Sequence, residues 1–548
     1  MAMSPRLLRP VNNVFSPASI PGLSLWLDAA AADALYQNSD GTVPATAPGD
    51  PVGYWRDRSG TGLTAVTADA TKRPLVATVN GRRALDFDGV NDTLTMQGYS
   101  AENGLTGLTR FAVAFADSSA SSILLTVTDN GISYKGGARF IDLQSSTIQF
   151  TAGSSGFTVG SVNVANTGYT LARDAPHVLG STYDGSKATL EEAILAHYDG
   201  ATLTPTSTSG AVYSPLVSGG TRLHMGSNVN ANNWWNGKIC EYLVYDRVLN
   251  PAQRRKVEVY LARRWGIALA PQASNAEAQD WINRVYANGG TVSTSTASAV
   301  STFCDAIESA GIRDRFARLN LFCGSSLNAA LVPLYKSLSF GGASLGNATD
   351  TNNAFVGVGT DYAETGASGG LTGNGTSKYL NTGLTVSNIG TPASGHMSVY
   401  HGQSSGVNSN RYYMGANDAA TSNRFYLGTD AFSTASVFGS YSSAVNASQT
   451  LAAQGHGAAG HRILSRETDS VLTHYHNGSV VATNTTTITP AVSTAAFAVF
   501  AANRNATVDR FHNSWIAAYS IGLGLNSTQA ANYRTIMQTF QTALGRNV

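Results

Sequence analysis

The segment "RRALDFDGVNDTLTM" (Arg82–Met96) decides the fold of the first half of the chain. In it, apolar Leu85 and Phe87 alternate with Asp86 and Asp88, and a glycine follows. Successive side chains of a β-strand point to opposite faces, so the two apolar side chains face a core while the acidic ones face outward or cap the turn. Asp-Gly is also a common turn dipeptide. The segment therefore predicts the corner of an antiparallel sheet.

A calcium site is the functional alternative for the same segment. Calcium takes about six to eight oxygen ligands at one point, and Asp86, Asp88, Asn91 and Asp92 would supply some of them. The similar segment "LTGNGTSKYL" later in the chain lacks the first two acids and has Lys378 opposite Asp92. We expect turn structure here, with any calcium site confined to the first half of the chain.

Strand-like segments fill the region around this corner. They are short, partly alternating and separated by Gly, Asn, Asp and Ser, as in "LSLWLDAA" from Leu23, "RFAVAFAD", "SSILLTVTD", "STIQFTAG" and "KICEYLVYDRVL". Glycine supplies the positive φ angles that tight turns need, and the chain has 56 glycines. The pattern is typical of an antiparallel sandwich. It ends in a predicted helix that is capped by Asn250, starts with Pro251 and stops at Gly266.

Helical patterns replace the strands between residues 272 and 343. "SNAEAQDWINRVYANGG" starts with a Ser/Asn cap and places Trp281 and Val285 on one side, and "STASAVSTFCDAIESAG" repeats the pattern with Phe303 and Ile307. A third helix is expected from "IRDRFARL". We predict that these helices form a connector between two β domains.

Strand patterns resume after residue 344 and echo the first half in the same order. "LDFDGVND" matches "LTGNGTSK", "TYDGS" matches "HYHNGS", and "LNPAQ" matches "LNSTQ". Ordered markers with drifting spacing are typical of a duplicated domain. We therefore predict an arm over residues 1–20, a first sandwich over 21–271, a helical connector over 272–343 and a second sandwich over 344–548. Each sandwich is closed by a C-terminal helix.

The composition restricts the classes of function. Charged residues make up 13% of the chain, and 35 Lys+Arg against 34 Asp+Glu leave a net charge of +1. This balance provides no electrostatic footprint for nucleic acid. The chain begins without the apolar core of a signal peptide and has no run of about 18 apolar residues, so we expect synthesis in a cytoplasm and no membrane insertion. Cys240, Cys304 and Cys323 match no zinc or redox spacing and are expected to be reduced.

Four motifs in fixed order resemble a known family. "LSLWLDA", "YWRDRSG", "RPLVATVNGRRALDFDGVND" and "GKICEYLVYDRVLNPAQRRKVEVYLARRWGI" resemble the concanavalin A-like, laminin-G-type jelly rolls of bacteriophage virion proteins. The resemblance covers residues 21–270, and the connector resembles segments of phage structural proteins that precede a second domain of this type. It implies tandem jelly-roll sandwiches that bind glycans or neighbouring proteins.

The segment "GSNVNANNWWNGKI" is the first candidate for glycan contact. Asn232 and Asn233 offer paired donors and acceptors for hydroxyl groups, and Trp234 and Trp235 offer flat faces for a pyranose ring. Adjacent residues of a strand point to opposite sides, so at most one of the two tryptophans enters the core. Trp55, in "YWRDRSGTG", is a further stacking candidate. The alternative for all of these residues is packing in a core or at a protein interface.

Signatures of catalysis are not found in the sequence. It contains no H-E-x-x-H helix, no P-loop and no E-x-D-x-x-E strand of the concanavalin-like glucanases. His474 and His476 would share one face of a strand, but no acidic or cysteine partner is near them in sequence. We expect a solvated or interface histidine pair there rather than a metal site, and no enzymatic activity.

Together these features predict a non-enzymatic structural protein on the surface of a bacteriophage virion, assembled in the host cytoplasm. It would be a tail fibre, decoration or baseplate-associated component that forms homo-oligomers. The arm over residues 1–20 would dock on other virion proteins. The alternative is a receptor-recognition protein that binds host cell-surface polysaccharide, with or without calcium.

Overall fold

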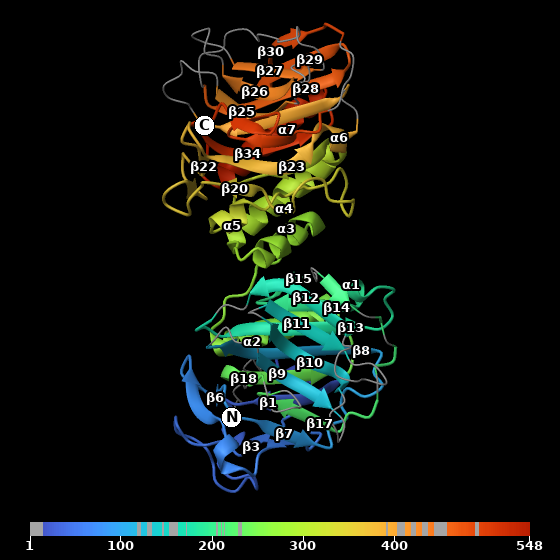
Figure 1. Cartoon of the computed structure of the whole chain (residues 1–548), viewed down its shortest axis with the longest axis vertical. Coiled ribbons are helices and arrows are strands. Elements are labelled where there is room, and N and C mark those ends of the chain that lie inside the picture. The colour runs from blue at the N-terminus through green and yellow to red at the C-terminus, as the bar shows by residue number, and fades with distance from the viewer. Residues whose placement is uncertain are drawn as a thin grey trace, which may run out of the picture. The chain divides into compact units, whose positions relative to one another are not determined.

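The computed structural model of the chain is mainly β and contains two compact units, Met1–Ala270 and Pro271–Val548 (Figure 1). Each unit contains two β-sheets that form a sandwich. No helix in the described part of the chain is long and apolar enough to cross a membrane. The structure describes all residues except 1–14, 118–121, 129–133, 145–146, 153–162, 171–172, 204–206, 210, 213, 217, 228–232, 391–392, 403–410, 418–423, 430–436, 443–457 and 488–492.

The first sheet of the first unit is built around the last strand of that unit, β18 (Asn236–Tyr245). Its strands in order are β15 (Ala201–Leu203), β14 (Ile194–Tyr198), β13 (His177–Asp184), β8 (Gly107–Ala116), β18, β6 (Arg82–Asp88) and β5 (Leu75–Val79), and β1 (Leu23–Asp28) also pairs with β18. All described pairs in this sheet are antiparallel. Strand β18, the last of the unit, lies between β8 and β6, which both precede it in the chain.

The second sheet faces the first across the core. Its strands in order are β16 (Ser207–Ser209), β12 (Asn163–Thr170), β11 (Thr147–Ala152), β10 (Tyr134–Gln144), β9 (Ser122–Thr128), β17 (Arg222–Met225), β7 (Leu94–Gln97), β4 (Thr64–Val66), β3 (Tyr54–Arg56) and β2 (Leu35–Tyr36). The unit also has three short helical segments: η1 (Pro17–Ser19) precedes β1, η2 (Ala70–Lys72) lies between β4 and β5, and α1 (Leu190–Ala193) lies between β13 and β14.

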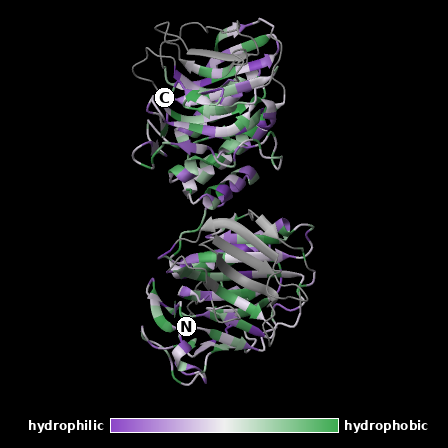
Figure 2. Cartoon of the chain, in the orientation of Figure 1, coloured by the Kyte–Doolittle hydropathy of each residue, from purple (hydrophilic) through white to green (hydrophobic). Residues whose placement is uncertain are grey.

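The alternation in β6 produces the two sides of the first sheet. Leu85 and Phe87 are fully buried in the sandwich core, as the pattern predicts, and Ala84 is buried on the opposite side of the sheet. Figure 2 shows hydrophobic and hydrophilic residues interspersed along the strands of both units. The predicted antiparallel sandwich is confirmed.

Helix α2 (Pro251–Trp265) covers the outer side of the first sheet, with Trp265 buried against it. The Asn250 side chain accepts a hydrogen bond from the backbone N–H of Gln253 (2.9 Å), and the Gln253 side chain accepts one from the N–H of Asn250 (3.1 Å). This reciprocal capping box satisfies donors that the first turn leaves free. The helix ends at Gly266, whose φ of 70° is the left-handed conformation that glycine adopts readily.

The carboxylate of Glu241 on β18 joins β1 and α2 to the sheet. It is fully buried and accepts hydrogen bonds from the indole N–H groups of Trp26 (2.8 Å) and Trp265 (2.7 Å) and from the hydroxyl of Tyr260 (3.1 Å). The Arg264 guanidinium lies 3.5 Å from it. Burial raises the pKa of Glu241 to about 7. Three elements thus meet at one buried acid.

The second unit repeats the plan of the first. Its first sheet has the order β21 (Tyr362–Ala363), β22 (Gly370–Thr372), β34 (Trp515–Gly522), β24 (Gly395–His401), β28 (Gly460–Thr468), β29 (Val471–His476) and β30 (Ser479–Asn484), with β19 (Phe316–Asn320) also on β34. The facing sheet has the order β20 (Thr351–Asn353), β23 (Tyr379–Thr385), β31 (Ala496–Val499), β25 (Arg411–Asn417), β26 (Arg424–Thr429) and β27 (Val437–Ser442). In addition, β32 (Ala502–Arg504) pairs with β25, and β33 (Thr507–Asp509) pairs with β32.

The described part of the second unit also contains the helices α3 (Ala276–Ala287), α4 (Thr294–Ser309), η3 (Arg313–Arg315), α5 (Leu327–Ala330), α6 (Val386–Ile389) and α7 (Ser527–Ala543). Helix α7 starts with a capping box of Asn526 and Gln529, as α2 does with its own Asn and Gln. In both units the last strand lies inside the first sheet, and the first strand pairs with it. The matching strand order confirms the tandem sandwiches predicted from the ordered markers.

The segment "IRDRFARL" is not the third helix expected from the sequence. It forms the short turn η3 and then strand β19, so the sheet of the second unit already begins at residue 316, inside the span 272–343. Arg318 enters the sheet fully buried because Asp350, also buried, lies 2.7 Å from its guanidinium, and the Tyr519 hydroxyl accepts a hydrogen bond from its Nε (3.0 Å). A buried guanidinium is tolerated when it is paired and hydrogen-bonded in this way.

The described end of the predicted arm packs on its own unit. The Phe15 ring lies 6.2 Å from the ring of Tyr260, and the Tyr245 hydroxyl donates a hydrogen bond to the carbonyl of Pro17 (3.1 Å). Residues 1–14 lie outside the described residues. Docking of the arm on other virion proteins stays a prediction.

Replacing Glu241 with leucine should destabilise the first unit by about 3 kcal/mol or more. The change leaves two indole N–H groups and a phenol hydroxyl buried without an acceptor, and each such loss costs about 1–3 kcal/mol. The free energy of unfolding is measured by urea titration of the full chain, with hydrogen exchange of β18 and α2 peptides reporting on the first unit. Glu192→Leu, at an exposed position of α1, is the matched control. Equal stability of the two variants would contradict the role assigned to Glu241.

Candidate functional site

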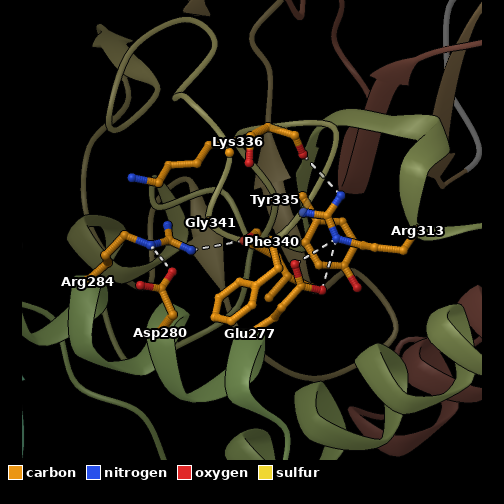
Figure 3. Close-up of a pocket in the computed structure, with 11 residues that line it drawn as sticks. Glu277, Asp280, Arg284, Arg313, Tyr335, Lys336, Phe340 and Gly341 are labelled. Carbon is orange, nitrogen blue, oxygen red and sulfur yellow. Dashed lines mark hydrogen bonds and ion pairs between the residues drawn. The ribbon is translucent and has the colours of Figure 1, made fainter.

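An open pocket of about 260 Å³ lies in the second unit between helix α3 and the segment that follows α5. Figure 3 shows its charged and aromatic side chains around the opening. The lining residues are Glu277, Asp280, Arg284, Arg313, Leu334, Tyr335, Lys336, Ser337, Phe340, Gly341 and Gly342. Helix, turn and loop each supply part of the polar lining.

Helix α3 presents three of the charged side chains. Glu277, Asp280 and Arg284 follow one another at helical spacing, so they share one side of the helix. Trp281, buried with its indole N–H on the carbonyl of Val332 (3.1 Å), holds the helix on the unit. The helix begins at Asn275, whose side chain accepts from the N–H of Glu277 (2.9 Å).

Arg313 of η3 and Glu277 form the inner ion pair of the pocket. The Nε of Arg313 lies 2.7 Å and 2.9 Å from the two carboxylate oxygens, and its Nη1 donates to the carbonyl of Ser337 (3.0 Å). The guanidinium also lies over the ring of Tyr335 at 3.9 Å (Figure 3). Burial raises the pKa of Glu277, and Arg313 opposes that shift. The pair fixes α3 against the 335–337 segment.

Arg284 and Asp280 form the outer ion pair. The Nε of Arg284 donates to the Asp280 carboxylate (2.8 Å), while Nη1 and Nη2 donate to the carbonyls of Pro333 (2.6 Å) and Leu334 (2.9 Å). One guanidinium therefore holds the loop backbone and a carboxylate at once. Each acid of the pocket is paired with an arginine.

The side chains of Lys336 and Phe340 can contact a ligand in the pocket. Within the described part of the chain, the Lys336 ammonium has neither an ion pair nor a hydrogen bond. Burial lowers its pKa, and Arg284 contributes to that shift. The Phe340 side chain is 58% exposed. The pocket thus combines a free cation, an exposed ring and polar groups held in place by ion pairs.

The sequence analysis missed this pocket because its parts come from separate segments. The spacing of Glu277, Asp280 and Arg284 on one side of α3 was the signal present in the sequence. Lys336 and Phe340 reach the pocket only through the pairing of residue 335 with Leu319 of β19, whose backbone groups exchange hydrogen bonds of 3.0 Å and 3.1 Å. No local pattern indicates that contact.

The predicted glycan-stacking residues are placed differently from the prediction. Trp55 and Trp235 are both fully buried in the core of the first sandwich, so neither can stack on a sugar. Trp234 is half-buried and Asn233, also half-buried, has a φ of 54°. Asn232 lies outside the described residues. As predicted, one tryptophan of the adjacent pair enters the core; for Trp55 and Trp235 the packing alternative is the correct one.

The acidic residues after β6 form a turn. One carboxylate oxygen of Asp88 accepts from the N–H groups of Val90 (2.8 Å) and Asn91 (3.1 Å), and Asp92 accepts from the N–H of Asp88 (3.0 Å). Asp86 instead lies 3.3 Å from the ammonium of Lys238. Asp88 and Asp92 thus bond backbone N–H groups of a turn, as expected from the sequence, and calcium binding by these residues stays a prediction.

Metal-ligand groups are not assembled elsewhere in the part of the chain that the structure describes. It contains no cluster of three or more His, Cys, Asp or Glu side chains placed to hold a metal ion. The three cysteines are free and buried. Burial raises the pKa of Cys304 to about 12, so its thiol stays protonated at neutral pH.

Histidines of the second sandwich are buried rather than solvated. His474 is 1% exposed, and neither of its ring nitrogens has a hydrogen-bond partner among the described residues, which corrects the expectation of a solvated or interface pair. His476 is half-buried. The fully buried Arg462 donates to Nε2 of His401 (3.2 Å), which requires that nitrogen to be unprotonated. Burial lowers the pKa of His396 and His476 to about 4, that of His512 to about 3, and those of His401, His461 and His474 well below the usual range.

Comparisons with known proteins give the fold alone. No protein-family model and no curated protein matches the chain. Similar solved structures include Trypanosoma rangeli sialidase, at 14% identity and a TM-score of 0.28 over 45% of this chain and 33% of that chain. The binding domain of Paraclostridial Mosquitocidal Protein 1 is 11% identical with a TM-score of 0.33, over 47% of this chain and 57% of that chain. The botulinum neurotoxin serotype D ligand-binding domain in complex with N-acetylneuraminic acid has 11% identity, a TM-score of 0.32 and the same coverages.

The sialidases among these structures contradict the expectation that the chain is not an enzyme, because a sialidase is an enzyme. We withdraw that expectation. The similar structures named above are 11–14% identical to this chain, with TM-scores of 0.28–0.33. They are too distant to transfer an activity or a ligand, so neither is inferred from them.

Acid should destabilise the second unit before the first. A histidine with a lowered folded-state pKa contributes stability that is fully present above its unfolded pKa of about 6.5 and is lost as pH falls toward the folded value. One such buried histidine contributes about 2 kcal/mol of loss at pH 5. In the first unit, burial also lowers the pKa values of His197 and His224, but these are two histidines against six among the described residues of the second unit. Glu241 and Asp92 of the first unit have raised pKa values of about 7 and about 6, so their contribution to stability is largest at low pH.

Hydrogen exchange of the full chain between pH 7 and pH 4.5, corrected for intrinsic rates, measures this difference. Peptides of β24, β28 and β34 should lose protection at a higher pH than peptides of β6, β8 and β18. His474→Leu removes an unpartnered buried imidazole and should shift the loss in the second unit to lower pH. The same pH of loss in both units would show that the histidines do not control it.

Proposed function

We propose that the chain binds carbohydrate on the surface of a bacterial host, in the pocket between α3 and residues 334–342, as a surface component of a bacteriophage particle. The observation that carries the proposal is the exposed ring of Phe340 beside polar groups held in fixed positions in one open pocket. Aromatic rings offer a flat apolar face, and charged side chains offer directional hydrogen bonds. A sugar has a C–H face and a rim of hydroxyl groups, so it uses both.

The polar groups of the pocket retain hydrogen-bonding capacity. A guanidinium has five N–H donors, and Arg284 uses three of them for Asp280 and two carbonyls. The ammonium of Lys336 keeps its donors. Because ion pairs hold α3 against the loop, these donors are fixed before a ligand arrives, and less ordering entropy is lost on binding.

The size of the pocket fits a short part of a glycan. Its volume of about 260 Å³ is near the lower end of small-molecule sites, about 300 Å³. We infer one sugar unit within a longer polysaccharide as the occupant. Many copies on a particle would then provide avidity beyond the affinity of one weak site.

The virion setting is proposed from the sequence. Its support is the ordered motifs that resemble phage jelly rolls, together with the low fraction of charged residues, 13%. A neutral polar surface suits packing against identical copies, which favours a homo-oligomer. Assembly would take place in the host cytoplasm.

Phe340→Ala should weaken binding to host polysaccharide at least tenfold, about 1.4 kcal/mol. The full chain is titrated with extracted capsule and lipopolysaccharide fragments of candidate hosts by biolayer interferometry. Val356→Ala, which trims another exposed apolar side chain of the same unit, is the control.

A Trp234→Ala variant separates the two candidate locations. Loss of binding in Trp234→Ala with full binding in Phe340→Ala would move the site to the first unit and reject the pocket. Absence of saturable binding to every host polysaccharide would reject carbohydrate recognition.

A further inference from the structure

We infer that the pocket selects a sugar that carries a negative charge, with Lys336 as the residue that recognises the anionic group; this inference rests on the proposed function. The pocket is lined by three cationic side chains, Arg284, Arg313 and Lys336, and by two anionic ones, Glu277 and Asp280. The two acids are matched by the two arginines, at 2.7 Å and 2.8 Å. One positive charge is left over, and it belongs to Lys336.

The surroundings of Lys336 are positive as well. After burial, the largest influence on its pKa is Arg284, which lowers it; Asp280 opposes this, and the buried Arg318 adds to the lowering. An ammonium among other cations gains more from an incoming anion than a solvated surface lysine does, because the low-dielectric surroundings screen the attraction less. The ligand anion would complete a charge balance that the pocket lacks.

The backbone places Lys336 rigidly. Its carbonyl accepts from the N–H of Leu345 (2.7 Å), and the preceding residue pairs with Leu319 of β19. Arg284 holds the carbonyls of residues 333 and 334. The loop that carries Lys336 is therefore fixed on both sides, and only its side chain needs to be ordered on binding.

Other ligand classes fit the charges less well. A cation would meet carboxylates that are already paired and an excess of positive charge. A neutral sugar would leave the ammonium of Lys336 partly desolvated without a counter-charge, which is unfavourable. A carboxylate, a sulfate or a phosphate on a sugar ring supplies the missing charge, and these three sources share the same chemistry.

The experiment compares defined anionic probes with their neutral counterparts. The full chain is titrated with oligogalacturonates, sulfated dextran oligomers and phosphorylated mannan oligomers, each beside the uncharged oligomer of the same backbone and length, at 50 mM and 500 mM NaCl. We expect at least one anionic series to bind tenfold or more tighter than its neutral counterpart, and less tightly at high salt. The series that binds identifies the anionic group.

Variants of Lys336 test the residue itself. Lys336→Gln should lose at least tenfold in affinity for the anionic probe, and Lys336→Arg should retain it within about threefold. Lys256→Gln, at an exposed position of α2, makes the same change in net charge and should bind as the unchanged protein does. Thermal unfolding of each variant checks that the fold is intact.

The outcomes separate this inference from the proposed function. Equal binding of neutral and anionic oligomers, or tight anionic binding by Lys336→Gln, would overturn the inference and leave carbohydrate binding standing. Failure of every oligomer, anionic and neutral, to bind the unchanged protein would overturn both.

Discussion

The buried carboxylate of Glu241 is the constraint on which the first unit depends. A charge taken out of water is tolerated only when partners satisfy it, and the hydrogen-bond donors to this acid come from β1 and α2. The acid is therefore satisfied only when first strand, last strand and terminal helix are in place together. In the second unit, the buried Arg318 of β19 likewise links the first strand to the last one, because it pairs with Asp350 and donates a hydrogen bond to Tyr519 of β34. In both sandwiches, a buried charged side chain stabilises the place where the first and last strands pair.

The sequence predicts the fold well where the determinants are local. The alternation of Leu85 and Phe87 and the cap at Asn250 depend on neighbours within a few residues, and both are found as expected. Arg318 was misread because its partner, Asp350, is 32 residues away, and without that partner a charged segment resembles an exposed helix. For the adjacent tryptophans, the strand period predicts that the two side chains point to opposite sides. It does not predict which of the two enters the core, and in the structure this is Trp235.

The candidate site was beyond sequence reasoning for a similar reason. A low fraction of charged residues, 13%, makes each charge informative, yet many of the charges lie in buried pairs. Whether a charge is paired depends on long-range contacts, as for Arg313 and Glu277, which lie 36 residues apart. Lys336 stands out only after such pairs have been identified in three dimensions. The side chains around Lys336 in the folded chain, rather than its neighbours in the sequence, mark it as a candidate ligand-binding residue.

The place of the last strand also governs how each unit is made. Strand β18 pairs with both β8 and β6 yet is synthesised about 150 residues after β6, which at about 5–20 residues per second takes on the order of ten seconds. During that interval β8 and β6 have open edges on a growing polypeptide, and open edges pair readily with other chains. Ribosomes that translate one messenger side by side would hold such unfinished sheets close together. During translation, the open edges of β8 and β6 in one chain can therefore pair with strands of a neighbouring chain, before β18 of their own chain has been made.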